Sequence, residues 1–459
     1  MVFVEGGMEY YSGSTWMKMG SYDDCVIAPP KSATRSFIVG GAGYGKSTLA
    51  LQYAYDWCNN VKHSFMRNYE IMILLRLRQL AGVPSIFTAI RRFILPKHST
   101  IKESDIKQIL GASTSVAFIL DGLDEYPEDD FTKDFDVMKI ILNKMFQNFE
   151  IIITSRYLPK YRSDMGAKRI RLTGFTCDAQ KRYIQKAVVN DKMKTQKIMH
   201  DIHDNPVVED FCQIPLFFVM FAHMSQEEKK EDFASCKTVT GFFRNMIKCF
   251  HTHMRNKLKD ANVQQYFLYE RDHRELDLIA FRGLSADRQQ IVWPKDYLRE
   301  RLGGEFYDQY VRIGILVEEE VLKDDPNSLG ITQTVRFYHK LFCEWYAAHY
   351  VAYVTRSEIS LQDFLKRTDP AGNQYMYRFA CGLSREASDK IIKYVKGKPD
   401  GSKFAILCIM EQNGNTDIVL DNVKDLCSRK VILARDQSKL LQRSTIQLLE
   451  IASTEGVSL

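Results

Sequence analysis

The chain is predicted to be an α/β protein, with a parallel sheet flanked by helices, followed by mostly helical regions. From Phe37 onward, short apolar runs alternate with segments of helical pattern, as expected for a parallel sheet. The runs are almost continuously apolar, which is typical of strands covered by helices on both faces. The predicted strands are Phe37–Val39, Ile71–Leu75, Val116–Leu120, Ile151–Thr154 and a less regular fifth, Arg169–Leu172.

A glycine-rich loop follows the first of these strands. The sequence GGAGYGKST fits the spacing G-x-x-x-x-G-K-[ST] between a strand and a helix. Glycines at these positions allow positive φ angles, so that backbone N–H groups and the following helix N-terminus form an anion site. Lys46 is expected to reach the β- and γ-phosphates of a nucleotide, and Ser47 to ligate Mg²⁺. A glycine-rich turn without a ligand would not explain a lysine and a hydroxyl in this register. The predicted nucleotide-binding residues of the loop are Gly40, Gly41, Ala42, Gly43, Tyr44, Gly45, Lys46, Ser47 and Thr48.

Acidic residues follow the third predicted strand, in the sequence DGLDE. Asp121 ends an apolar strand beside the phosphate loop, so it is predicted to hold Mg²⁺ through water. Glu125, or else Asp124, could orient or deprotonate an attacking water molecule. For these last two residues, a solvated acidic turn is the alternative interpretation.

The fourth predicted strand ends in Thr154-Ser155-Arg156. Ligands of parallel sheets bind at the carboxyl ends of the strands, so this sequence delivers two hydroxyls and a guanidinium to the same edge. Arg156 is a candidate sensor of the γ-phosphate, because its planar fork matches phosphate oxygens. An ordinary strand-end arginine in a surface ion pair is the alternative.

Length, charge and cysteine usage restrict the class of protein. A chain of 459 residues is expected to form two to four domains. The 63 basic and 57 acidic residues form no basic block, so a nucleic-acid or membrane-surface role gains no support. Ten scattered cysteines without C-x-x-C suit reduced thiols. The longest apolar run, Ile214 to Ala222, is too short to cross a bilayer, so a soluble cytoplasmic protein is expected.

Changes in pattern suggest six regions. The first 36 residues are rich in Gly, Ser, Asp and Pro, and are predicted to be an arm or linker. The apolar helix Leu341 to Val354 follows two strand-like runs around the turn Asp325-Pro326-Asn327, which suggests a winged-helix domain. The predicted regions are an N-terminal arm (1–36), a nucleotide-binding domain (37–172), a first helical domain (173–258), a winged-helix domain (259–355), a second helical domain (356–445) and a C-terminal tail (446–459).

Taken in order, these motifs resemble those of the NACHT family of P-loop NTPases, in the signal-transduction ATPase (STAND) class that includes NOD-like receptors. The motifs are GGAGYGKSTLA, FILDGLDE, IIITSR, LTGFT, IPLFF and FYHKLFCEWYAA, and the resemblance covers residues 35 to 350. It implies ATP or ADP with Mg²⁺ as cofactors. It also implies that Arg78 lies near the nucleotide and that Pro215 packs on the adenine. By the same resemblance His339, in the winged-helix domain, touches the β-phosphate of ADP; a core histidine is the alternative.

The resemblance further implies a signalling switch. Such a switch exchanges ADP for ATP, opens, and forms homo- or hetero-oligomers through NACHT domains, in innate-immune or cell-death signalling. Slow ATP hydrolysis would reset it. A non-catalytic adaptor that assembles with longer NACHT proteins is an alternative, and an ATPase motor is less favoured because no helicase-like motifs are present.

Two departures from the family pattern stand out. The family usually has glutamine before the glutamate of its last helix motif, whereas Cys343 precedes Glu344 here. No effector domain or repeat array is recognisable in the sequence. The pairs His200/His203 and His251/His253 have spacings that a metal could use, but no carboxylate or cysteine cluster accompanies them, and solvated helix positions are expected.

Overall fold

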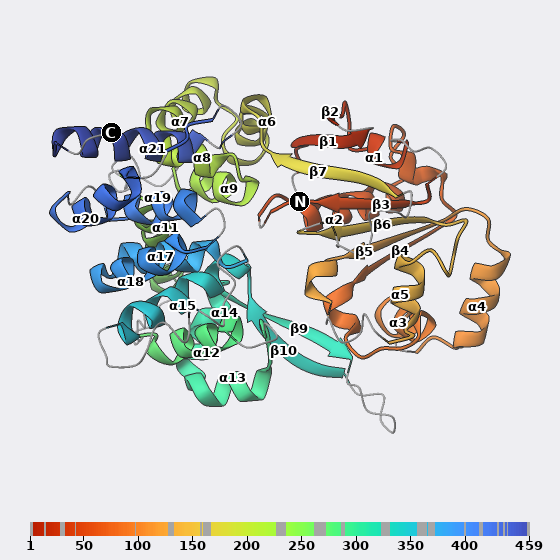
Figure 1. Cartoon of the computed structure of the whole chain (residues 1–459). Helices are drawn as coiled ribbons and strands as arrows, with labels where there is room; N and C mark the ends of the chain where they lie inside the picture. The colour runs from red at the N-terminus through yellow and green to blue at the C-terminus, as the bar shows by residue number, and fades with distance from the viewer. Residues whose placement is uncertain are drawn as a thin grey trace. The chain divides into compact units, whose positions relative to one another are not determined.

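The computed structural model divides into two compact units, and each is described by itself (Figure 1). Unit 1 comprises Met1–Thr195, Gln213–Val219 and Glu320–Thr332, and unit 2 comprises Gln196–Cys212, Met220–Glu319 and Gln333–Leu459. The structure describes residues 3–12, 15–27, 33–41, 43–96, 98–126, 133–156, 158, 167–225, 236–260, 272–285, 290–322, 331–355, 365, 372–398, 401–412, 416–428, 431–434, 437 and 439–456.

A seven-stranded sheet forms the centre of unit 1. Its parallel part is β7 (Lys168–Gly174), β3 (Arg35–Val39), β6 (Glu150–Ser155), β5 (Val116–Asp121) and β4 (Ile71–Arg76), in that spatial order. All five predicted strands are therefore confirmed. The structure extends each of them by one to three residues.

Helices cover both faces of this sheet, and alternate residues of one strand serve the two faces. In β5, Phe118 and Leu120 belong to a core with α3 (Ile86–Phe93), α4 (Glu103–Ala112) and α5 (Asp136–Ile141). Ala117 and Ile119 belong to a second core with α2 (Lys46–Cys58) and α1 (Asp24–Ile27). Successive side chains of a strand point to opposite faces, so a strand buried on both faces reads as continuously apolar.

The N-terminal segment differs from the prediction of a linker. It forms β1 (Gly7–Ser12) and β2 (Thr15–Lys18), and β1 pairs antiparallel with β2 and β7. Within β1 only Met8 is buried, so the strand carries no apolar pattern. Polar contacts attach it instead: the Arg171 guanidinium lies 2.5 Å from the Glu9 carboxylate and 4.4 Å from the centroid of the Trp16 ring.

Short elements complete unit 1 at both ends of the sheet. The 3-10 helices are η1 (Phe65–Asn68), η2 (Leu77–Leu80) and η3 (Leu123–Glu125). Beyond β7, α6 (Cys177–Tyr183) continues into a π-helical turn, η6 (Ile184–Val188). The predicted first helical domain begins at residue 173, yet residues 173–195 and 213–219 cluster with the sheet in unit 1.

Unit 2 consists mostly of helices. Helices α7 and α9 contribute residues to both units. The remaining helices among the described residues are α7 (Lys192–Asp204), α8 (Pro206–Cys212), α9 (Pro215–Met224), α11 (Val239–Asp260), α12 (Arg274–Ser285), α13 (Lys295–Leu302), α14 (Gly304–Arg312), α15 (Lys340–Val354), α17 (Gln374–Leu383), α18 (Arg385–Lys396), α19 (Gly401–Met410), α20 (Thr416–Cys427) and α21 (Lys439–Thr454). In the described ranges, no helix combines the length and apolarity needed to cross a bilayer.

Strands before α13 and after α14 form a small sheet, and a buried helix, α15, follows the last of them. The sheet has the order β8 (Val292–Pro294), β10 (Ile331–Phe337), β9 (Leu316–Leu322), so a third strand joins the two that were predicted. The predicted turn, residues 325–327, lies outside the described residues. Helix α15 is buried along most of its length, as its apolar sequence predicts.

The C-terminal segment also differs from the expected tail. Helix α21 continues to Thr454, and Leu448 and Ala452 are fully buried. Their spacing of four residues places both side chains on one helix face. Residues 457–459 lie outside the described residues. All ten cysteines are free thiols.

Candidate functional site

The glycine-rich loop connects β3 to α2 at the carboxyl edge of the sheet. Gly43 (φ 81°) and Gly45 (φ 89°) are both left-handed, a conformation that side chains with a Cβ rarely adopt. The loop is tied to the neighbouring strand because the Gly40 N–H donates to the Ser155 carbonyl at 3.2 Å. Ala42 lies outside the described residues. Tyr44 is partly buried, and Thr48 is exposed on the first turn of α2.

The Lys46 ammonium lies inside the loop. It donates to the carbonyls of Gly40 at 2.7 Å and Gly41 at 3.1 Å. Burial lowers the pKa of Lys46. The carboxylate of Asp124 opposes this shift in pKa, whereas the positive charge of Arg156 adds to it. A buried cation held by neutral carbonyls is favoured by an incoming anion, so this lysine suits a phosphate ligand.

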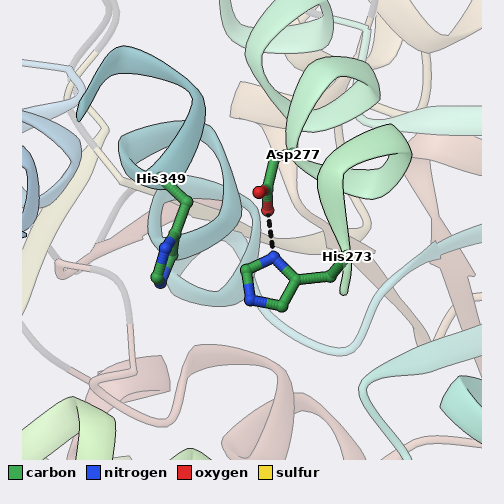
Figure 2. A group of neighbouring side chains, drawn as sticks. All are labelled: His273, Asp277 and His349. Carbon is green, nitrogen blue, oxygen red and sulfur yellow. Dashed lines mark hydrogen bonds and ion pairs between the residues drawn. The ribbon is translucent and has the colours of Figure 1, made fainter. Parts of the chain in front are cut away.

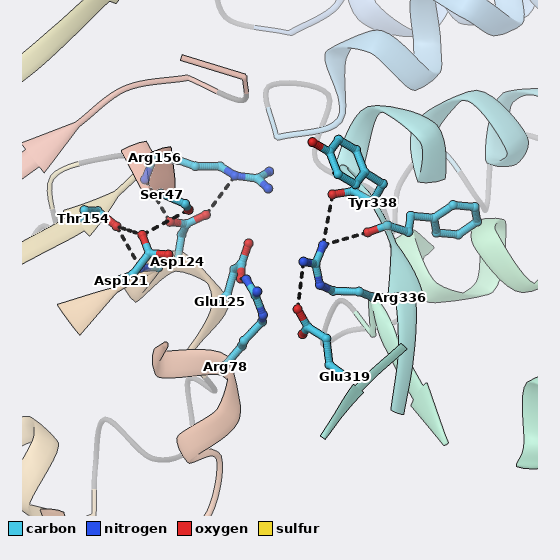
Figure 3. Close-up of polar contacts among 12 residues, drawn as sticks. Ser47, Arg78, Asp121, Asp124, Glu125, Thr154, Arg156, Glu319, Arg336 and Tyr338 are labelled. Carbon is cyan, nitrogen blue, oxygen red and sulfur yellow. Dashed lines mark hydrogen bonds and ion pairs between the residues drawn. The ribbon is translucent and has the colours of Figure 1, made fainter. Parts of the chain in front are cut away.

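Ser47 and Asp121 meet at the edge of the sheet, where Thr154 joins them (Figure 3). The Asp121 Oδ1 atom accepts from the Ser47 hydroxyl at 3.1 Å and from the Thr154 hydroxyl at 2.6 Å. Thr154 in turn accepts from the Gly122 N–H at 2.9 Å. A serine hydroxyl oriented by a carboxylate in this way can ligate Mg²⁺, and the carboxylate can reach the ion through a water molecule.

Two arginines hold the acidic residues of η3 from opposite sides (Figure 3). The Arg156 Nε atom lies 2.8 Å from Asp124, and its backbone N–H donates to the same carboxylate at 3.0 Å. The Arg78 guanidinium donates to Glu125 at 2.7 Å. This arrangement follows from the sheet order, because β5 lies between β4, which precedes Arg78, and β6, which precedes Arg156. Arg156, the predicted sensor of the γ-phosphate, therefore forms an ion pair, which was the alternative interpretation of this residue.

The start of α9 contacts the glycine-rich loop within unit 1. The Leu216 N–H donates to the Gly43 carbonyl at 3.2 Å, and a Cβ added at Gly43 would lie 2.9 Å from the Ile214 side chain. Pro215 stands between these two residues and is partly buried. The predicted adenine-packing proline therefore belongs to a segment that touches the loop, although 170 residues separate them in sequence.

His339 caps the buried helix α15 in unit 2. Its Nδ1 atom accepts from the Leu341 N–H at 3.2 Å, and the side chain is partly buried. The preceding segment is fixed by Arg336, which donates to the carbonyls of Phe337 at 2.9 Å and Tyr338 at 3.0 Å (Figure 3). Arg336 also forms an ion pair with Glu319 at 2.9 Å. A sequence match alone did not indicate this capping role.

The departure at position 343 has a structural explanation. The Cys343 thiol is buried and points at the Ala280 carbonyl of α12, 3.7 Å away. Glu344 accepts from the backbone N–H groups of Tyr375 and Met376, both at 3.0 Å, at the start of α17. The glutamate therefore joins two helices of unit 2, and the thiol fills the contact beside it.

The histidines expected at solvated positions fall into two groups. His200 and His203 are exposed and lie next to Asp204 and Glu209, at 2.6 and 3.2 Å. His251 differs from the expectation because it is fully buried beside Tyr310 in unit 2. Nothing in the spacing of His251 predicts its burial, since the contact comes from Tyr310, 59 residues further along the chain.

Comparisons with known proteins agree with this geometry. The NACHT domain family model matches residues 34–191. The chain is 21% identical to NLR family CARD domain-containing protein 4 of Xenopus tropicalis over 78% of its length, and 25% identical to human NACHT, LRR and PYD domains-containing protein 2 over 66%. It covers 34% and 28% of these two proteins, so it spans about a third of the relatives it matches.

Among solved structures, a STAND protein with a tetratricopeptide repeat sensor from Pyrococcus horikoshii matches 95% of this chain and 65% of its own, at 13% identity and a TM-score of 0.33. The family model, by contrast, spans the phosphate loop, the acidic residues after β5 and the arginine after β6 in one continuous match. Residues 34–191 of the chain therefore match the NACHT domain family, and NLR-family proteins are among the relatives of the chain.

Proposed function

We propose that this chain is an ATP/ADP-dependent signalling switch. The observation that carries the proposal is the convergence of Lys46, Ser47 and Asp121 at one sheet edge, with Ser47 and Asp121 oxygens 3.1 Å apart. A polyphosphate chelated to Mg²⁺ presents the charges that these groups complement. The P-loop NTPase fold itself implies nucleotide binding.

The residues divide the binding work between phosphate and metal. Lys46 would exchange a loop carbonyl for phosphate oxygens, while Ser47 and Asp121 hold Mg²⁺, Asp121 through water. When bound, Mg²⁺ would neutralise part of the phosphate charge. Thr154 positions the Asp121 carboxylate through its 2.6 Å hydrogen bond. Pro215 is proposed to pack on the adenine, on the segment that contacts Gly43.

Glu125 is the better candidate than Asp124 for activating water. The Asp124 side chain is 7% exposed and is held twice by Arg156, whereas the Glu125 side chain is 24% exposed and accepts from Arg78. A more accessible carboxylate is better placed to polarise a water molecule. Because Glu125 must share its oxygens with Arg78, hydrolysis is proposed to be slow, as a resetting step requires.

The switch itself is proposed to depend on His339. Since Nδ1 accepts the capping hydrogen bond, the neutral ring carries its proton on Nε2 and can donate there to a phosphate oxygen. We assign α12 to α15 with the three-stranded sheet to a winged-helix domain, which would dock on ADP through this donor and release when ATP replaces it. Differential contact in the two states is what such a switch needs.

Assembly and cellular role are proposed from the relatives. Names such as NLR family CARD domain-containing protein 4 describe proteins more than twice as long as this chain. We propose oligomerisation through the NACHT domain, a cytoplasmic location, and a role in innate-immune or cell-death signalling. Assembly with longer NACHT proteins is compatible with the same site and would be visible as co-purification.

The direct test is the nucleotide carried by freshly purified protein, identified by mass spectrometry, with the particle mass measured by light scattering. ADP bound to a monomer that assembles after ATP is added supports the switch. Protein that carries ATP and remains monomeric, or that turns ATP over rapidly without assembling, refutes it.

Two variants separate the capping role of His339 from its proposed phosphate contact. His339→Asn keeps a side-chain acceptor for the Leu341 N–H but removes the Nε2 donor, whereas His339→Ala removes both and should cost about 1 kcal/mol of stability. If the proposal holds, both variants release ADP faster than the wild-type protein. Unchanged ADP release in His339→Asn would leave His339 as a helix cap alone.

A further inference from the structure

Three side chains capable of binding a metal meet in unit 2 (Figure 2). His273 immediately precedes α12, Asp277 lies on the first turn of that helix, and His349 lies on α15. One ligand atom from each residue lies within 4.8 Å of the other two. Among the described residues, these three are the histidine, cysteine or carboxylate side chains whose possible ligand atoms lie this close together.

Local structure fixes two of these side chains on the same helix. A spacing of four residues places His273 and Asp277 one above the other, and Nδ1 of His273 lies 2.7 Å from the Asp277 carboxylate. This contact holds the imidazole ring in one orientation beside the carboxylate. The sequence pattern could have indicated this pair, but not its third member, 72 residues beyond Asp277.

Aromatic rings hold His349 against that pair. The ring centroids of His273 and His349 are 4.7 Å apart, with their planes at 80°. Trp345 packs edge-on against His349, with centroids 4.8 Å apart, and Tyr346 packs against His273 at 5.2 Å. Both imidazoles are therefore already ordered, and a ligand that used them would lose little side-chain entropy.

A second, independent observation concerns the Nε2 atom of His349. It is buried, and within the described part of the chain it has no hydrogen-bond partner. A buried polar atom without a partner is unfavourable, so this nitrogen is a candidate to bind a ligand that the protein does not itself supply. A cation coordinated by this nitrogen would meet that requirement.

We propose that His273, Asp277 and His349 bind a divalent transition-metal ion of the zinc class. Two imidazole nitrogens and one carboxylate oxygen form a ligand set typical of Zn²⁺, whereas Mg²⁺ and Ca²⁺ prefer oxygen alone. Metal–ligand distances of about 2.0 to 2.2 Å place neighbouring ligand atoms of a tetrahedral site about 3.4 Å apart. The possible ligand atoms now lie within 4.8 Å of one another, so the most distant of them must approach by little more than about 1 Å. Three protein ligands leave the fourth position for water.

The site would join α12 to α15, the helix that His339 caps. Coordination would add metal–ligand bonds to the packing and the thiol–carbonyl contact between these two helices. Metal binding to the folded state would stabilise unit 2 by mass action. The inference concerns a site separate from the glycine-rich loop and does not depend on nucleotide binding.

The test uses untagged protein that has been stripped of metal by a chelator and freed of nucleotide. Titration with Co²⁺ is expected to saturate at one equivalent, with the visible absorption of a tetrahedral site, and Zn²⁺ is expected to displace the Co²⁺. The ten cysteines are alternative ligands for the added metal. A cobalt–thiolate charge-transfer band would show that the metal binds to them and would overturn the proposal. Absence of stoichiometric binding of either metal to the wild-type protein would overturn it as well.

Variants then locate the site. His349→Gln and His273→Gln should each weaken Co²⁺ binding by at least about tenfold, and Zn²⁺ should raise the melting temperature of the wild-type protein but of neither variant. His200→Gln is the matched control, since His200 and Asp204 repeat the same spacing on α7, lie 2.6 Å apart and are exposed. Equal Co²⁺ affinity in wild-type protein and in both ligand variants would refute the assignment, and if one variant misfolds, the other still decides.

Discussion

Two glycines of the phosphate loop are expected to respond differently to the same substitution. Gly43 and Gly45 are both left-handed, at φ 81° and 89°. A Cβ at Gly43 would lie 2.9 Å from Ile214 and 3.0 Å from Leu216, whereas a Cβ at Gly45 would meet no atom within 4 Å. The open space at Gly45 is where the loop would receive phosphate, so the two variants separate a packing cost from a ligand clash.

The expected magnitudes follow from these contacts. An L-residue in the left-handed region costs about 1 to 2 kcal/mol, and both Gly43→Ala and Gly45→Ala incur that cost. Gly43→Ala must in addition displace the segment at the start of α9, and overpacking of this kind costs about 1 to 3 kcal/mol more. For a domain of this size, the additional cost corresponds to a melting temperature lower by roughly 2 to 12 °C.

Differential scanning fluorimetry without nucleotide measures the first effect, and calorimetric titration with ATP and Mg²⁺ measures the second. Gly43→Ala is expected to melt below Gly45→Ala. Gly45→Ala is expected to lose nucleotide affinity while it retains more of its stability. If the two variants melt together, the contact between the loop and residues 214–216 does not constrain the folded protein, and the coupling of loop and helix inferred here is wrong.

Three further predictions concern charged residues. Lys46→Ala should weaken ATP binding by at least about a hundredfold, because charged hydrogen bonds are worth about 1.5 to 3 kcal/mol each, and retained micromolar affinity would show that the loop is not the site. Glu125→Gln should keep ATP binding and lose turnover, and turnover that survives there but is lost in Asp124→Asn would transfer the role to Asp124. Burial raises the pKa of Glu150 to about 7 from 4.5, although Lys168 lies 3.4 Å away, so the folded state keeps a proton that the unfolded chain loses. The stability that this proton contributes is present below pH 4.5 and is lost as the pH rises through 7. Glu150→Gln should therefore flatten the dependence of melting temperature on pH in this range. An unchanged dependence in the variant would contradict the assignment to Glu150.

The sequence alone predicted the parallel strands of the large sheet but not the antiparallel strands at its edge. Residues 116–120 predict a strand because alternate side chains enter two different cores, which leaves a continuous apolar run. Strand β1 buries only Met8 and is held by the ion pair of Glu9 with Arg171, 162 residues away. An edge strand stabilised by a distant charge leaves no local pattern, so the segment was predicted to be a linker.

The candidate site shows the same division between local and distant information. Spacing alone identified Lys46, Ser47 and Asp121, because loop, helix and strand end are each local features. Which arginine pairs with which acid depends on the order of strands in the sheet, and no periodicity encodes that order. The approach of Leu216 to the loop and of His349 to His273 likewise depends on packing between helices far apart in sequence.

The charges of the nucleotide site have a consequence for its chemistry. The charged side chains discussed at the sheet edge are Lys46, Arg78, Arg156, Asp121, Asp124 and Glu125, three of each sign. A polyphosphate that approaches Arg156 must compete with Asp124, which already binds that guanidinium at 2.8 Å. Asp124 also accepts from the Arg156 backbone N–H, a contact that does not depend on the position of the guanidinium. We therefore propose that Arg156 responds to a γ-phosphate by exchanging one anion for another, as a sensor does and a permanent structural ion pair does not.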